Sequence, residues 1–96
     1  MTVHGELLSE QNAAGLMTSV PDWTLGDDLI SREFGFEDIR ESMAFSESVV
    51  DLAEEQKHHP DIYISFNHVT LVLTTHKVGG LTQADFALAE AIDRLL

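Results

Sequence analysis

The side chains best suited to acid–base chemistry gather in residues 53–82, a stretch that holds a His-His-Pro sequence and one later histidine. These histidines are His58, His59 and His76. Because an imidazole titrates near neutral pH, a group of them can supply a proton donor and a proton acceptor together. The set therefore suits a reaction that donates a proton at one atom and removes a proton at another, as the loss of water from a carbinolamine requires.

Two carboxylates accompany the histidines. Glu54 precedes His58 by four residues, a spacing that places both side chains on the same face of a helix. We therefore expect Glu54 to orient the imidazole of His58. Asp85 stands three residues after Thr82, which is the spacing of a capping box at the start of a helix.

A histidine cluster is also compatible with zinc, since three histidines and a water form a known catalytic arrangement. However, an extended backbone would send the side chains of the adjacent His58 and His59 apart, and the HExxH spacing is absent. The sequence thus predicts no metal ligand, and a zinc-dependent hydrolase remains an alternative.

The elements that must position these groups can be predicted from periodicity. Apolar residues recur at helical spacing over residues 37–57, with Asp38 as a cap, and this helix must end before Pro60. Beyond the proline, two alternating stretches predict strands separated by Asn67 and His68. An Asn67-His68 loop places Phe66 opposite Val69. It also gives one apolar face, which comprises Ile62, Ile64, Phe66, Val69, Leu71 and Leu73.

The same register carries the pairing outward from the loop to the histidines. Pro60 then lies beside Thr75, and His59 lies beside His76 as a cross-strand neighbour. We therefore expect one site at the junction of the long helix and this hairpin.

The remaining elements complete the fold. A short helix is predicted over residues 9–19 with Ser9 as its cap, and a hairpin over 22–36 turns at residues 26–28. A final helix follows Thr82. The order α-β-β-α-β-β-α predicts a two-layer α+β fold, with a four-stranded antiparallel sheet and three helices on one face, as a single domain over residues 1–96.

Composition excludes several classes of function. Seventeen acidic residues against five basic ones give a net charge of −12, which would repel a phosphate backbone, so no direct binding to nucleic acid is expected. The sequence has no cysteine, no basic and apolar leader at its start and no apolar stretch long enough to span a membrane. We expect a cytoplasmic protein that does not bind a membrane.

The stretch "AEEQKHHPDIYISFNHVTLVLTTHKVGGLTQADFALA" resembles the pterin-4a-carbinolamine dehydratases. Their signature combines an acidic residue, three spacer residues, His-His-Pro, an aromatic residue, a later histidine and a downstream aspartate. In this sequence these elements fall on Glu54, His58, His59, Pro60, Phe66, His76 and Asp85. Ile62 occupies a position where several members carry tryptophan.

The resemblance implies dehydration of 4a-hydroxytetrahydrobiopterin to quinonoid dihydropterin, which recycles the cofactor of aromatic amino acid hydroxylases. It implies no cofactor, because the pterin is the substrate, and it implies a homodimer or homotetramer. His58, His59 and His76 are the implied catalytic residues. Glu54, Pro60, Thr75 and Asp85 are the predicted substrate-binding residues. A non-catalytic dimerisation or interaction module is a second hypothesis, with the long amphipathic helix as its surface.

Overall fold

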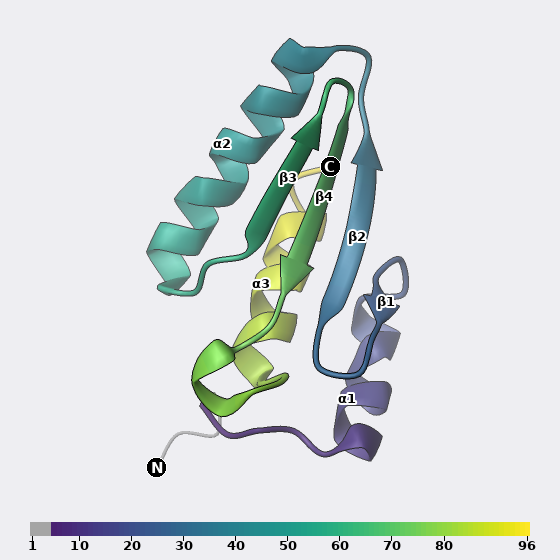
Figure 1. Ribbon diagram of the computed structural model, residues 1–96, viewed down its shortest axis with the longest axis vertical. Helices are drawn as coiled ribbons and strands as arrows, with labels where there is room; N and C mark the ends of the chain where they lie inside the picture. Colours follow the sequence, from purple (N-terminus) through teal and green to yellow (C-terminus); the bar gives the residue numbers. More distant parts are fainter. Residues whose placement is uncertain (1–4) are drawn as a thin grey trace.

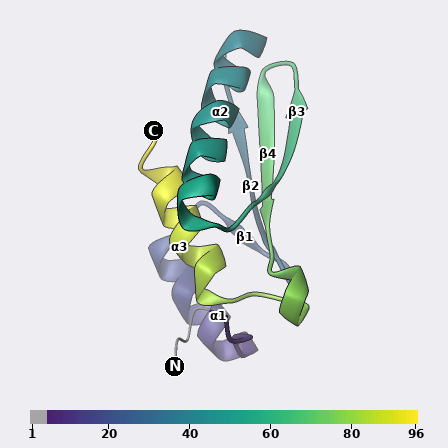
Figure 2. The ribbon, with the colours of Figure 1, turned by 90° about the vertical axis from the view of Figure 1, so that its left-hand side faces the viewer.

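The computed structural model describes residues 5–96, which form a four-stranded antiparallel sheet with its helices on one face (Figures 1 and 2). The sheet order is β1-β2-β4-β3. The strands are β1 (Thr24–Leu25), β2 (Ile30–Gly35), β3 (Asp61–Ser65) and β4 (His68–Leu73). The helices are α1 (Glu10–Leu16), α2 (Ile39–Gln56) and α3 (Gln83–Asp93), with short 3₁₀ turns η1 (Met17–Ser19) and η2 (His76–Val78). The predicted α+β fold class is confirmed.

Helix α2 begins and ends for local reasons that the sequence indicates. The Asp38 side chain accepts a hydrogen bond from the amide of Glu41 at 2.9 Å, which confirms the predicted N-cap. After Gln56 the backbone of Lys57 turns left-handed, with φ of 55°, and the amide of His58 donates back to the carbonyl of Ala53 at 3.1 Å. This reversal ends the helix before Pro60 and turns the chain toward β3.

The hairpin of β3 and β4 forms, but its predicted register is wrong by two residues. Ile64 pairs with Val69 and Ile62 with Leu71, so the loop is Phe66-Asn67 and not Asn67-His68. Within this loop Phe66 takes the left-handed conformation, with φ of 51°. Because a shift of two residues preserves the alternation of a strand, the strand residues keep the face that the sequence predicts.

The core lies between this face of the sheet and the helices, as Figure 2 shows edge-on. The central strands β2 and β4 contribute several fully buried side chains to the core, whereas the edge strand β3 is mostly exposed. The fully buried residues of the sheet and of α2 and α3 include Ile30, Val69, Leu71, Leu73, Val49, Leu88 and Ile92.

Arg32 lies on the inward face of β2, between buried apolar residues. Its guanidinium donates to the Asp93 carboxylate at 2.8 Å, and the Trp23 indole donates to the same oxygen at 2.8 Å. The arginine also lies over the ring of Phe34, 4.4 Å from the centroid. Asp93 thereby links α3 to the first hairpin. It also provides the partner for Arg32, the charged residue on the otherwise apolar inward face of β2.

The other predicted elements are also present. Ser9 accepts a hydrogen bond from the amide of Asn12 and caps α1, which passes into η1. Gly26 donates to the carbonyl of Leu29 at 2.8 Å in the turn of the first hairpin. Within residues 5–96, no helix is both long enough and apolar enough to cross a membrane.

Replacing Leu71 with Ala should lower the free energy of unfolding by about 2–5 kcal/mol, because the side chain is fully buried and its removal leaves a cavity. Leu25→Ala in the edge strand β1, where the leucine is 38% exposed, should cost less than about 1 kcal/mol. Urea denaturation measures both. Equal losses in the two variants would contradict the assignment of the core.

Candidate functional site

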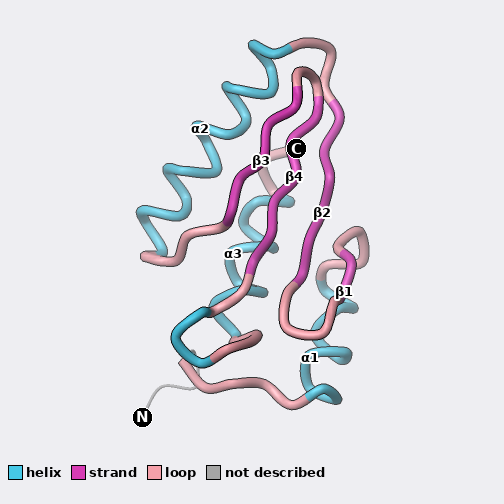
Figure 3. The backbone as a smooth tube through the Cα atoms, viewed as in Figure 1, coloured by secondary structure: helices cyan, strands magenta, loops and turns pink. Residues whose placement is uncertain are grey.

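One cavity of about 440 Å³ lies where the α2–β3 loop meets the connection from β4 to α3. Figure 3 shows both loops near the end of the sheet opposite the β3–β4 turn. His58, His59, His76 and Thr75 line this cavity, which we call the histidine cleft. The predicted convergence of the three histidines is therefore confirmed. The other lining residues are Gly5, Lys57, Thr74, Lys77, Val78, Thr82 and Ala84.

His58 contacts Asp85 and not Glu54, so the predicted partner was wrong. Its Nε2 lies 2.5 Å from Oδ1 of Asp85, and the two side chains are 15% and 0% exposed. The helical spacing fails as a guide because the left-handed Lys57 ends the helix and redirects His58 toward α3. The carboxylate that sequence spacing identifies as a cap is thus also the partner of a histidine.

Asp85 is held by the first turn of its own helix and by the strand end beside it. The amide of Thr82 donates to Oδ2 at 2.9 Å, which completes the predicted capping box. The hydroxyl of Thr75 donates to the same oxygen at 2.8 Å. A carboxylate without solvent contact is stable only when its oxygens accept such bonds. The buried Asp85 therefore lies behind His58 and does not line the cleft.

His59 contacts the carboxylate that was assigned to its neighbour. Its Nε2 lies 2.6 Å from Oε2 of Glu54, in a pair whose side chains are 60% and 70% exposed. The two adjacent histidines thus contact different carboxylates. One pair is buried and the other is open to water.

His76 lies in the cleft, but it is not part of the strand in which the sequence predicts it. Strand β4 ends at Leu73, and His76 begins the 3₁₀ turn η2, so it is not a cross-strand neighbour of His59. Thr75 instead forms an isolated bridge with Gly80, which closes a tight loop around η2. The predicted pairing was wrong because it extended the strand past the point where this loop begins.

Pro60, the last predicted site residue, is half-buried and does not line the cleft. Sequence reasoning missed Lys57 and Lys77, which do line it. They are the only two lysines of an acidic sequence, and each lies next to a histidine. That adjacency was a usable signal for both.

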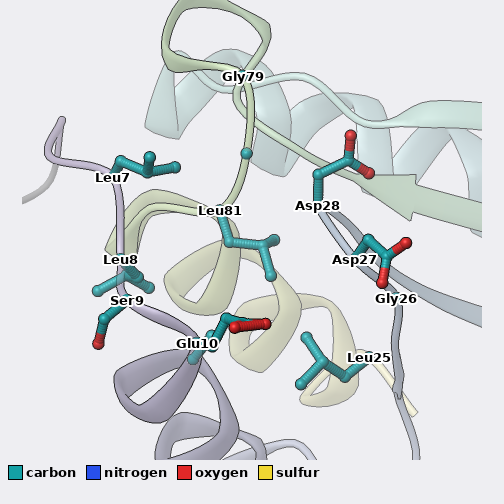
Figure 4. Close-up of a pocket in the computed structure, with 12 residues that line it drawn as sticks. Leu7, Leu8, Ser9, Glu10, Leu25, Gly26, Asp27, Asp28, Gly79 and Leu81 are labelled. Atoms are coloured by element: carbon teal, nitrogen blue, oxygen red, sulfur yellow. The ribbon is translucent and has the colours of Figure 1, made fainter.

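A second cavity of about 340 Å³ lies on the other side of the β4–α3 connection (Figure 4). Leucines and the carboxylates of Glu10, Asp27 and Asp28 line it, and no histidine does. It therefore lacks the donor and acceptor pair that acid–base chemistry needs near neutral pH. The histidine cleft is the candidate active site.

Carboxylates engage one ring nitrogen in each of two cleft histidines. In both His58 and His59, Nε2 faces a carboxylate, so Nδ1 is the ring nitrogen outside these contacts. Over residues 5–96, no group of three or more histidine, aspartate or glutamate side chains is arranged to hold a metal ion. A cavity lined by three imidazoles can donate and accept protons near neutral pH.

Asp85→Asn should lower the free energy of unfolding by about 3 kcal/mol, because the amide places an N–H group against buried donors and breaks a buried pair. Glu54→Gln, the matched change at the exposed pair, should alter it by less than about 0.5 kcal/mol. Urea unfolding of both variants tests the difference. Similar losses would mean that burial does not separate the two pairs.

Comparison with known proteins gives a consistent result. The family model described as pterin 4 alpha carbinolamine dehydratase matches residues 6–95. Two curated relatives, whose names assign this activity provisionally, come from Thermomicrobium roseum and Chloroflexus aurantiacus. They are 44% and 47% identical to the chain, over 92% and 93% of its length and 95% and 96% of their own.

Two solved structures share the fold. A transcriptional coactivator/pterin dehydratase from Brucella melitensis has a TM-score of 0.88 at 26% identity, covering 94% of this chain and 98% of that one. A pterin dehydratase-like protein described as a RuBisCO assembly factor of the alpha-carboxysome has a TM-score of 0.61 at 24% identity, covering 76% and 84%. The histidine cleft and these matches together place the chain in the pterin-4a-carbinolamine dehydratase family.

Proposed function

We propose that this protein dehydrates a pterin 4a-carbinolamine, 4a-hydroxytetrahydrobiopterin, to quinonoid dihydropterin. The observation that carries the proposal is the gathering of His58, His59 and His76 around one cavity, with two of the rings held by carboxylates. Membership of the family supports the same reaction.

The reaction requires one proton to be donated to the substrate and one proton to be removed from it. The hydroxyl on carbon 4a gains a proton and leaves as water when its carbon–oxygen bond breaks. The neighbouring ring nitrogen loses a proton, and its electron pair forms the new carbon–nitrogen double bond. In this proposal the cleft histidines exchange these protons, with Nδ1 as the acting nitrogen of His58 and His59.

The substrate is the product of an oxygenation that leaves a hydroxyl at carbon 4a of a tetrahydropterin. We propose an aromatic amino acid hydroxylase as the source, so that the dehydratase returns the pterin to its reducible form. In this scheme the protein itself carries no cofactor, because the pterin arrives as the substrate.

His76→Ala should lower kcat by roughly 10²–10⁴ if this ring exchanges a proton in the reaction. Stopped-flow absorbance of carbinolamine decay, with and without protein, measures the rate against the spontaneous reaction. His68→Ala is the matched control, because His68 begins β4 and does not line the cleft. An unchanged rate in His76→Ala would remove this residue from the mechanism.

The same assay separates the alternatives. A wild-type protein that does not accelerate carbinolamine decay would favour an interaction module, which exposed apolar residues of α2 support. These are Ile39, Met43 and Val50, which are 42%, 50% and 44% exposed. A zinc-dependent hydrolase predicts loss of activity after chelation, whereas activity retained in a metal-free sample excludes it.

We further propose that the protein is a homodimer or homotetramer. Strand β3 is an edge of the sheet, and no strand within residues 5–96 pairs with its outer side, where another chain could pair. Exposed apolar residues accompany that edge, with Tyr63 at 59% and Ile64 at 38%. A chain of this size gains apolar burial by self-association.

Ile64→Lys should shift the sedimentation coefficient toward that of a monomer, because a charge on the edge strand opposes strand pairing. Leu25→Lys is the matched control, since Leu25 is also 38% exposed and lies on β1 at the opposite edge. Dissociation by Leu25→Lys alone would place the interface on the other edge.

A further inference from the structure

Thr75 lines the histidine cleft, yet its hydroxyl is already engaged within the protein. It donates to Oδ2 of Asp85 at 2.8 Å and lies 3.0 Å from the hydroxyl of Thr82. Since a threonine hydroxyl has one proton, Thr75 can only accept in its contact with Thr82. The bonds therefore run in one direction, from Thr82 to Thr75 to Asp85.

Both carboxylate oxygens of Asp85 have hydrogen-bond partners. Oδ2 receives the Thr75 hydroxyl and the Thr82 amide, and Oδ1 faces Nε2 of His58. Rotation of an aspartate carboxylate about its last torsion has broad minima, so its plane is set by the hydrogen bonds that it accepts. Among residues 5–96, Thr75 is the only side-chain donor to the oxygen that faces away from the histidine.

We propose that Thr75 is a positioning residue that acts on His58 through Asp85. Its hydroxyl fixes the plane of the carboxylate, and the carboxylate in turn holds the proton of His58 on Nε2 and leaves Nδ1 to exchange protons in the cleft. The sequence suggested that Thr75 binds the substrate. The proposal rests on the dehydratase function for its catalytic consequence and on the hydrogen bonds alone for its structural one.

The pair of Glu54 and His59 lacks a supporting residue of this kind. Glu54 and His59 are mostly exposed, and the Glu54 carboxylate has no second partner among residues 5–96. Water can compete for that carboxylate, whereas the plane of Asp85 is fixed from both sides. His58 is therefore the histidine whose orientation the fold determines.

Thr75→Val removes the hydroxyl and keeps the shape of the side chain. It should lower kcat about tenfold, the effect of losing one hydrogen bond to a charged group, with KM changed by less than about twofold. Thr75→Ser should restore most of the rate because it restores the donor. Carbinolamine decay measured over a range of substrate concentrations separates kcat from KM.

Nitrogen-15 chemical shifts of the His58 ring provide a readout that does not depend on turnover. In the wild-type protein they should report the proton on Nε2, and in Thr75→Val they should report a mixture of the two tautomers. Thr18→Val is the matched spectroscopic control, because the hydroxyl of Thr18 donates to the carbonyl of Gly15 at 2.9 Å and Thr18 does not line the cleft. It should leave the His58 shifts unchanged. If Thr75→Val does not fold, Thr75→Ala replaces it in both measurements.

Each outcome decides the proposal. A raised KM with unchanged His58 shifts in Thr75→Val would overturn it in favour of direct substrate binding. If the wild-type protein shows no turnover, the proposed function fails, and the His58 shifts alone decide whether Thr75 positions the ring. Shifts that change in Thr75→Val and recover in Thr75→Ser support it, and shifts that stay constant refute it.

Discussion

The carboxylate of Asp85 has no contact with solvent. The part of the fold that holds the histidines therefore depends on the hydrogen bonds that this carboxylate accepts. Its bonds come from the start of α3, from Thr75 two residues after β4 and from the loop after α2. Losing any one donor would leave part of a buried charge unpaired, which is far more costly than losing an exposed contact. One side chain therefore joins three elements that are distant in the sequence and sets where the histidine cleft can form.

The two histidine–carboxylate pairs differ in their exposure to solvent. His58 is held by a buried partner with its own supports, whereas His59 and Glu54 meet in solvent. An exposed ion pair contributes little to stability because water and salt screen it. A site of this kind has one imidazole fixed by the fold and another that can adjust to a bound molecule. This asymmetry would suit a reaction with two proton transfers at neighbouring atoms.

Local sequence signals correctly predicted the three α-helices and the four strands, but they carried β4 past its end at Leu73. Caps at Ser9, Asp38 and Thr82 mark the starts of the three α-helices, and alternation marks the strands. The register of the second hairpin was the weak point, because Phe66-Asn67 and Asn67-His68 both keep the apolar residues on one face. The alternation of a strand cannot distinguish registers that differ by two residues. Only packing against β2 and α2 does so.

The sequence by itself determined that His58, His59 and His76 lie together, since the three line one cleft although the predicted register of the hairpin was wrong. It could not determine their partners. Helical spacing joined Glu54 to His58, but the left-handed Lys57 broke that spacing and brought His58 to Asp85, which lies 27 positions away. Pairing between side chains depends on where a chain reverses and on which carboxylate is buried. Both follow from the tertiary structure, because burial makes an unpaired charge costly and so selects the partner.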